Sequence, residues 1–94
     1  YVSPFEVEAT LVQHPAVLEA AVIGVAGTNG LTRVKAFVVL KPDAAASDGE
    51  LKAFVKDRLA PYKYPREIEF LTELPKTATG KIQRFRLRER EAAH

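Results

Sequence analysis

Two apolar runs rich in β-branched residues constrain the fold most strongly. They read "AVLEAAVIGV" over residues 16–25 and "VKAFVVL" over residues 34–40, and we interpret each as a strand. The first run is apolar at consecutive positions, which predicts a strand covered on both faces. The segment between the runs, "AGTNGLT", contains the turn-forming pair Asn29-Gly30, so the simplest pairing of the two strands is antiparallel.

A helix is predicted ahead of the first strand, in "SPFEVEATLVQ". Ser3 can act as its N-cap, Pro4 suits the first helical position, and Glu6 completes a capping box. Pro15 disfavours helical geometry at the residue before it, so the helix ends at His14-Pro15. Three apolar side chains at helical spacing are expected to share one face of this helix: Phe5, Ala9 and Val12.

A second helix is predicted after the surface linker "DAAASDG". Ser47 and Glu50 have the spacing of a capping box, and Asp48 and Lys52 are correctly spaced for a weak ion pair along the helix. Arg58 falls within the apolar arc, where its stem can pack while its charged head reaches water. The predicted apolar stripe consists of Leu51, Phe54, Val55 and Leu59.

A connector, a third strand, a loop and a third helix complete the chain. The connector "APYKYP" is stiff and extended, because two prolines bracket Tyr62, Lys63 and Tyr64. "EIEFL" is predicted to be a strand, and residues 83–92 a short, strongly charged helix. The order of helix, two strands, helix, strand, loop and helix predicts an α+β fold with a small antiparallel or mixed three-stranded sheet flanked by helices.

Composition excludes several kinds of site. The chain of 94 residues has no cysteine, which rules out disulfides, thiolate zinc sites and cysteine nucleophiles. Its only histidines, His14 and His94, are too few and too far apart to suggest a metal site. No membrane span or signal peptide is recognisable, so we expect a cytoplasmic location and no membrane partner. Because the chain starts at Tyr1 and lacks methionine, we expect a piece of a longer protein.

The C-terminal fifth is the positive end of the molecule. Formal net charge is only +2, but residues 76–94 hold two acidic residues, Glu89 and Glu91, against six basic ones: Lys76, Lys81, Arg84, Arg86, Arg88 and Arg90. This indicates either solubility or attraction to an anionic partner. A nucleic-acid-binding module is one alternative, although Phe85 and Leu87 alternate with the arginines as in an ordinary packed helix. A small protein-interaction domain is another, and it would leave Lys81 dispensable.

The segment "PKTATGKIQR" places a lysine directly after a glycine. A phosphate-binding P-loop requires glycine where this chain has Pro75, and Ser or Thr where it has Ile82, so that motif is excluded. The earlier stretch "GVAGTNG" lacks the lysine and is better explained as a hairpin turn. Gly80 removes a Cβ that would crowd an incoming partner, and the long side chain of Lys81 can reach well beyond its own domain.

The motif "LPKTATGKIQR" closely resembles the last core motif of the adenylate-forming enzymes. This family includes acyl- and aryl-CoA synthetases, luciferases and the adenylation domains of peptide synthetases. The likeness extends to "VSPFEVE" near the start and to "VLEAAVIGV", "KAFVVLK" and "LAPYKYPREIEFLTELP", so it spans nearly the whole chain. Among the ligases, the sequence is most similar to benzoate-CoA ligases and related aryl-CoA ligases.

The resemblance implies that residues 1–94 are the mobile C-terminal lid domain of a larger enzyme. In this family a much larger N-terminal domain binds most of the ATP, its Mg²⁺ and the carboxylic acid, which is expected here to be aromatic. The lid closes in one orientation to form the acyl-adenylate, then rotates to form the thioester with coenzyme A. By its position in the motif, Lys81 matches the catalytic lysine of the first step. The domain alone is expected to be inactive.

Further site residues are implied around the coenzyme A nucleotide. In relatives the proline-bracketed connector helps to hold it, through ring stacking on adenine and a lysine contact to phosphate, and core packing is the alternative. The residues concerned are Tyr62, Lys63 and Tyr64. Arg33 lies in a loop that is near coenzyme A in some relatives. Arg84 is interpreted as a solvated helix charge, with pairing to a carboxylate or phosphate as the alternative, and Glu6 and Glu8 as capping and structural residues.

Overall fold

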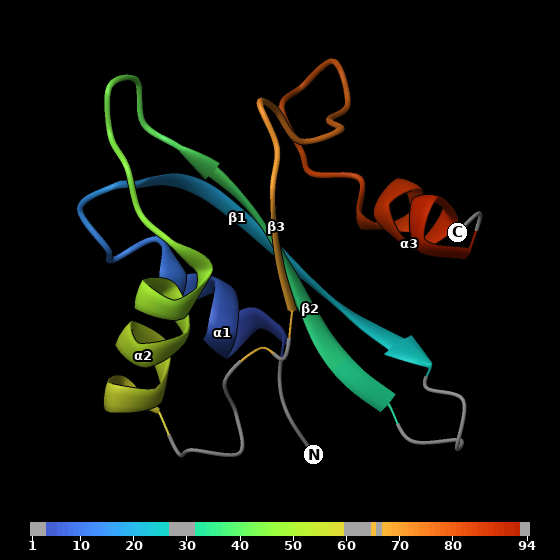
Figure 1. The fold of residues 1–94 in the computed structure, drawn as a ribbon. Coiled ribbons are helices and arrows are strands. Elements are labelled where there is room, and N and C mark those ends of the chain that lie inside the picture. The colour runs from blue at the N-terminus through green and yellow to red at the C-terminus, as the bar shows by residue number, and fades with distance from the viewer. Residues whose placement is uncertain (1–3, 27–31, 60–64, 66, 93–94) are drawn as a thin grey trace.

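The computed structural model describes residues 4–26, 32–59, 65 and 67–92, without the side chains of residues 25, 26, 32, 33 and 92. Within these ranges, helices and strands follow one another in the predicted order (Figure 1). Their bounds are α1 Pro4–Leu11, β1 Val17–Ala26, β2 Thr32–Leu40, α2 Asp48–Arg58, β3 Glu67–Phe70 and α3 Arg84–Ala92. None of these helices is long and apolar enough to cross a membrane.

The sheet is mixed, with the strand order β1-β2-β3. β1 and β2 pair antiparallel with Ala21 opposite Phe37, which confirms the predicted pairing of the two apolar runs. The predicted Asn29-Gly30 turn between them lies outside the described residues. β3 pairs parallel with β2 and places Glu69 opposite Phe37. Parallel neighbours need a long crossover connection, and the segment that contains α2 provides it.

Both faces of the β1–β2 ribbon are covered, as the consecutive apolar positions predicted. Side chains alternate between the two faces of a strand, so Ala20 and Val22 point to one layer and Ala21 and Ile23 to the other. The first layer has a buried core of Val7, Leu11, Val17, Ala20, Val22, Ala36, Val38, Leu51 and Val55. The second has a buried core of Ala21, Ile23, Phe37, Val39, Leu74 and Leu87. Figure 1 shows α1 and α2 on one side of the crossing strands and α3 on the other.

The packed face of α1 differs from the predicted one. Val7 and Leu11 are fully buried. The side chains predicted to share the apolar face are exposed instead: Phe5 at 65%, Val12 at 46%, and Ala9. The two stripes lie on roughly opposite sides of the helix, because residues two apart are separated by about 200°. Both stripes have helical spacing. The stripe of Val7 and Leu11 faces the core, and the neighbouring Glu8 faces the same way, since its carboxylate is bound inside the domain.

The ends of the helices follow the predicted signals where the structure describes them. α1 ends at Leu11, ahead of Pro15, and its predicted cap Ser3 lies outside the described residues. The Ser47 hydroxyl accepts from the Glu50 N–H at 3.1 Å, which confirms Ser47 as the N-cap of α2. This contact satisfies one of the backbone N–H groups that a helix start leaves without an intrahelical partner.

The apolar stripe of α2 is confirmed, with two depths of burial. Its fully buried members are Leu51 and Val55, and its half-buried members are Phe54 and Leu59. Lys52 Nζ lies 3.7 Å from Asp48 Oδ2, as the spacing predicted. The guanidinium carbon of Arg58 lies 3.6 Å from the centre of the Phe54 ring. Arg58 therefore lies over an aromatic ring of its own helix with its charge exposed, a cation–π arrangement that explains its place in the apolar arc.

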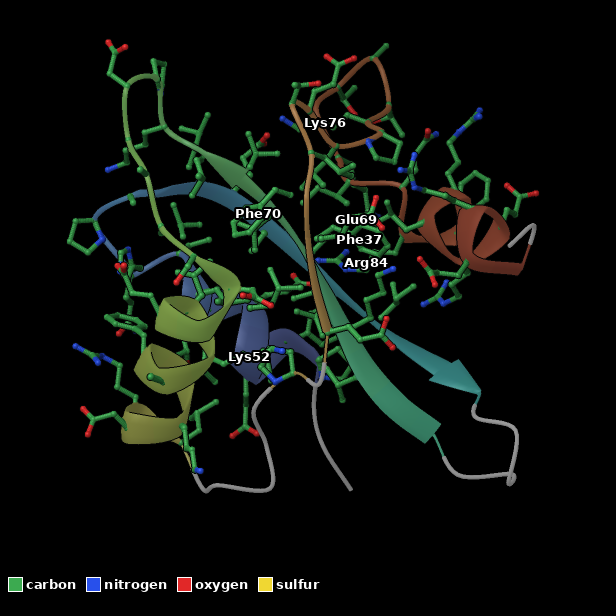
Figure 2. The ribbon with its side chains drawn as sticks, viewed as in Figure 1. Phe37, Lys52, Glu69, Phe70, Lys76 and Arg84 are labelled. Atoms are coloured by element: carbon green, nitrogen blue, oxygen red, sulfur yellow. The ribbon has the colours of Figure 1, made fainter. Side chains whose placement is uncertain are left out.

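Four charged side chains attach the C-terminal half of α3 to the sheet. Lys35, a buried residue of β2, donates from Nζ to Glu91 Oε1 at 2.5 Å and to Glu69 Oε1 at 3.1 Å. Arg90 Nη2 donates to Glu69 Oε2 at 2.6 Å. Among the described side chains of α3 only Leu87 is buried, so these polar contacts fix the orientation of the helix. Figure 2 shows Glu69 on the side of the sheet nearer α3.

These contacts shift the pKa values of two members in opposite directions. Burial acts to lower the pKa of Lys35, but hydrogen bonds to Glu91 and Glu69 outweigh it and raise the pKa above the ordinary 10.5. Burial acts to raise the pKa of Glu69, but hydrogen bonds from Lys35 and Arg90 outweigh it and lower the pKa below the ordinary 4.5. Both groups are therefore charged around neutral pH, where their pairing stabilises the fold.

We predict a loss of stability in acid that depends on Glu69. A carboxylate whose pKa is lowered by folding contributes stability above its unfolded-state pKa, and the contribution is lost as the pH falls below about 4.5. Glu69→Gln should cost about 1 kcal/mol at neutral pH and should make the acid-induced decline shallower. Thermal unfolding of the 94-residue domain over a series of pH values measures both effects. An equally steep decline in the variant would contradict the prediction.

Candidate functional site

The glycine-lysine motif lies in a small hairpin that follows β3. Residues 75–83 are referred to below as the lysine hairpin, and Figure 1 shows this segment between β3 and α3. Backbone hydrogen bonds join the two strands of the hairpin, so the segment is internally ordered. Its backbone contacts are the antiparallel bridge between Lys76 and Ile82, the hydrogen bond from the Thr77 N–H to the Lys81 carbonyl at 2.9 Å, and that from the Gln83 N–H to the Pro75 carbonyl at 2.8 Å.

Thr77 organises the tip of the lysine hairpin. Its carbonyl accepts from the Gly80 N–H at 2.9 Å, which closes a four-residue turn. Its hydroxyl accepts from the Lys81 N–H at 3.1 Å and lies 2.9 Å from the Thr79 hydroxyl. Gly80 has a φ of 88°, in the left-handed region that favours glycine, and a Cβ there would meet no atom within 4 Å. Within this domain, backbone conformation and not crowding requires the glycine.

Lys81 extends from the end of this turn. Its side chain is exposed, and no carboxylate in the described part of the chain pairs with its ammonium. Lys35, Lys52 and Lys76 differ, because each has an acidic partner. An exposed ammonium that no described carboxylate pairs with, on an ordered backbone, is suited to meeting an anion from outside the domain.

Apolar contacts and one ion pair hold the lysine hairpin against the second layer. Leu74, just before it, and Leu87 of α3 are buried in the core of that layer, and Ile82 packs against the same core. On the first strand of the hairpin, Lys76 pairs with Glu19 of β1. Figure 2 shows Lys76 at the base of the hairpin. The motif is therefore anchored to the sheet close to the residue that it presents.

Arg84, the first residue of α3, is not the solvated charge that the sequence suggested. Both carboxylate oxygens of Glu8 accept from its guanidinium, with Nε 2.8 Å from Oε2 and Nη2 bound to Oε1. Glu8 Oε2 also accepts from the Val22 N–H at 2.7 Å. Hydrogen bonding to Glu8 raises the pKa of Arg84 above its ordinary value. The alternative, pairing with a carboxylate, is thus confirmed, as is the structural role expected for Glu8.

The predicted coenzyme A residues are placed only in part. Arg33, which was predicted to lie in a loop, belongs to β2 instead, because the antiparallel pairing with β1 extends to this position and places its backbone opposite Val25. Its side chain lies outside the described part of the structure. Pro65, which ends the connector, is fully buried. The remaining candidates lie outside the described residues: Tyr62, Lys63 and Tyr64. Their roles stay predictions.

A groove of about 350 Å³ lies between α3 and the segment that follows β3. Its arginines already have partners within the domain, because Arg90 pairs with Glu69 and Arg86 Nε donates to Gln83 Oε1 at 2.7 Å. Lys81 does not line the groove, so the groove and the lysine are separate features. The lining residues are Leu71, Thr72, Glu73, Pro75, Arg86, Leu87 and Arg90.

No three His, Asp or Glu side chains gather to form a metal site in the part of the chain that the structure describes. His14 has a structural role, since its Nδ1 accepts from the Ala16 N–H at 3.1 Å and its Nε2 lies 2.9 Å from Glu50 Oε2. Its ring also meets the Phe54 ring edge-on, which joins the start of β1 to α2.

We predict that Gly80→Ala strains the lysine hairpin without a steric clash. The left-handed backbone costs an alanine about 1 kcal/mol, and nearby atoms leave room for its methyl group. Gly80→Asn should cost less, because asparagine tolerates this conformation better than alanine does. Denaturant unfolding of the 94-residue domain ranks the two variants and the unsubstituted domain. Equal stability of the glycine and alanine forms would contradict the observed backbone geometry.

The sequence matches a protein family and several relatives that are CoA ligases. The family model described as AMP-binding enzyme C-terminal domain matches residues 6–81. The chain is 62% identical over 91 residues to a benzoate–CoA ligase of Thauera aromatica. It is 50% identical over 93 residues to a 4-hydroxybenzoate–CoA/benzoate–CoA ligase of Rhodopseudomonas palustris. These matches cover 94% and 95% of this chain, and the chain spans 17% of the length of each relative.

Solved structures share the fold. A crystal structure of a benzoate CoA ligase from Burkholderia xenovorans LB400 is 68% identical, with a TM-score of 0.84 over 94% of this chain and 18% of its own. A crystal structure of an acyl-CoA synthetase from Brucella canis is 49% identical, with a TM-score of 0.89 over 96% of this chain and 17% of its own. The predicted α+β fold with a small mixed sheet is confirmed, and the chain belongs to the AMP-binding enzyme C-terminal domain family.

Proposed function

We propose that residues 1–94 are the mobile C-terminal lid of an AMP-forming CoA ligase that acts on an aromatic carboxylic acid, with Lys81 as the catalytic cation of acyl-adenylate formation. The observation that carries the proposal is the exposed Lys81 ammonium on an internally bonded hairpin. The ligase class is supported by family membership. The aromatic substrate is supported by the names of the benzoate–CoA ligases at 62% and 50% identity.

The first half-reaction brings two anions together. A carboxylate oxygen of the substrate attacks the α-phosphorus of ATP, an acyl–phosphate bond forms, and the bond to pyrophosphate breaks. A cation between the carboxylate and the phosphate oxygens offsets their repulsion and stabilises charge on the leaving group. At about 4 Å in a partly dry site, one such contact is worth on the order of 4 kcal/mol.

Lysine has the right properties for this task. Its compact ammonium carries three donors on a long stem, so it can reach a reacting phosphate from a neighbouring domain. The lysine hairpin supplies the fixed backbone from which the side chain extends. In this role Lys81 acts as a positioned charge and not as a nucleophile.

The second half-reaction requires coenzyme A, and we assign part of its site to the connector. A tyrosine ring stacked on adenine and the lysine beside a phosphate would hold the nucleotide. The residues concerned are Tyr62, Lys63 and Tyr64. ATP, Mg²⁺ and the acyl group are assigned mainly to an N-terminal domain of the same enzyme, with Mg²⁺ neutralising phosphate charge when it is bound. We propose that the enzyme is cytoplasmic.

Nucleic-acid binding, the alternative raised by the basic C-terminal segment, receives no support. Non-specific binding of this kind needs several free cations that can contact consecutive phosphates. Three of the six basic residues counted in this segment form ion pairs within the domain instead, and Arg86 donates to Gln83. The pairs are Lys76 with Glu19, Arg84 with Glu8, and Arg90 with Glu69.

We predict that Lys81→Ala in the full-length enzyme abolishes most adenylation and spares thioester formation. Acyl-dependent ATP–pyrophosphate exchange should fall by about 100-fold or more, because a charge aimed at the transition state is lost. Thioester formation from supplied acyl-adenylate should be largely retained, since the lysine is not used in that orientation of the lid.

Lys52→Ala is the matched control. Lys52 is a lysine of α2, in the layer on the other side of the sheet, and Figure 2 labels it there. Its removal should change exchange by less than about twofold. Equal loss of both half-reactions in Lys81→Ala, or normal exchange in that variant, would contradict the proposed role of Lys81.

A further inference from the structure

Two charged side chains, one near the start of the lysine hairpin and one directly after its end, tie it to the rest of the domain. At the first end, Lys76 pairs with Glu19 of β1. At the second, Arg84 pairs with Glu8 of α1. The second pair is the more buried, with side chains 24% and 11% exposed against 34% and 25% for the first. The Glu8 contact is therefore the better shielded from water and salt.

The carboxylate of Glu8 is held from two directions. Both of its oxygens accept from the Arg84 guanidinium, and Oε2 also accepts from the Val22 backbone N–H. A two-point contact between arginine and carboxylate fixes orientation as well as distance. Val22 lies in β1, an edge strand of the sheet, and its side chain is fully buried. The start of α3 is thereby tied through Glu8 to the backbone of β1.

The backbone between Arg84 and Lys81 has little slack. Each intervening residue has a contact that limits its movement relative to the first strand of the hairpin, and Ile82 also packs against the core of the second layer. A displacement of Arg84 is therefore passed to the backbone of Lys81. The contacts are the Gln83 N–H to the Pro75 carbonyl, the Ile82 bridge to Lys76, and the Lys81 carbonyl to the Thr77 N–H.

We propose that Glu8 is a positioning residue for Lys81. This inference rests on the proposed function of Lys81 in adenylation. Glu8 does not touch the substrate; through Arg84 it fixes the backbone from which the ammonium extends. A lysine side chain has four rotatable bonds, so its charge is placed accurately only when its backbone is fixed. A misplacement of about 1 Å at a reacting group can cost up to ~100-fold in rate.

Glu8→Gln in the full-length enzyme tests the proposal. Glutamine keeps the shape of the side chain, and its carbonyl oxygen can still accept from the Val22 N–H, but it lacks the charge that binds Arg84. The kcat of ATP–pyrophosphate exchange should fall by about 10-fold, with the KM for ATP changed less than about threefold. Thioester formation from supplied acyl-adenylate should be unchanged.

Two further variants separate positioning from folding. Arg84→Lys keeps the positive charge but loses the planar fork, and it should reproduce the selective loss of exchange even if Glu8→Gln does not fold. The double variant Glu8→Gln with Lys81→Ala should be no slower than Lys81→Ala alone, because a residue that acts through Lys81 has no effect once that side chain is removed.

Glu69→Gln is the matched control for the substitution. It makes the same chemical change at the other attachment of α3, where Glu69 binds Lys35 and Arg90. It should lower the unfolding temperature while leaving the ratio of the two half-reactions unchanged. If weaker attachment of α3 were itself the cause, the ratio of the two half-reactions would change in both Glu8→Gln and Glu69→Gln.

The outcomes distinguish this inference from the function on which it rests. Equal slowing of both half-reactions by Glu8→Gln, or a further loss when it is added to Lys81→Ala, would overturn the positioning role and leave the proposed function standing. Normal exchange in Lys81→Ala would overturn the proposed function itself, and the positioning role with it.

Discussion

The β1–β2 ribbon is apolar on both faces, and the remaining elements are arranged to cover it. α1 and α2 close the face of Ala20 and Val22, while α3 and the lysine hairpin close the face of Ala21 and Ile23. Each layer gains about 25 cal/mol for every Å² of apolar surface removed from water. The segment that carries Lys81 is therefore part of a packed layer, and this explains why its backbone is ordered up to the turn.

The two layers are held by different forces. α2 contributes two fully buried apolar side chains, whereas Leu87 is the only buried one among the described side chains of α3. At its ends α3 relies on ion pairs with Glu8, Lys35 and Glu69. Exposed pairs of this kind contribute little, but removing one partner of a buried pair leaves a charge without compensation. The position of α3 consequently depends on directional contacts, which specify the orientation of a helix more closely than apolar packing does.

The sequence specifies the order of elements well because its signals are local. The apolar runs, the Ser47 cap and the proline stops act within a few residues, and the motif around Lys81 identifies that residue directly. The contact between Arg84 and Glu8 joins residues 76 positions apart, and no local pattern indicates it. The face of α1 was mispredicted for a related reason, since two stripes have helical spacing and only the tertiary position of Glu8 decides between them. For the hairpin, small polar residues suggested an open loop, but the Thr77 hydroxyl and carbonyl order it.

The internal bonding of the lysine hairpin has a consequence for the timing of the proposed chemistry. A turn that is bonded to itself and anchored to the sheet keeps its backbone fixed within the domain, so in the proposed mechanism the backbone of Lys81 is carried to and from the reactants by movement of the whole domain. The two chemical steps then become mutually exclusive in time. In the proposed cycle one orientation of the lid serves adenylation and the other serves thioester formation, so the domain cannot support both steps at once.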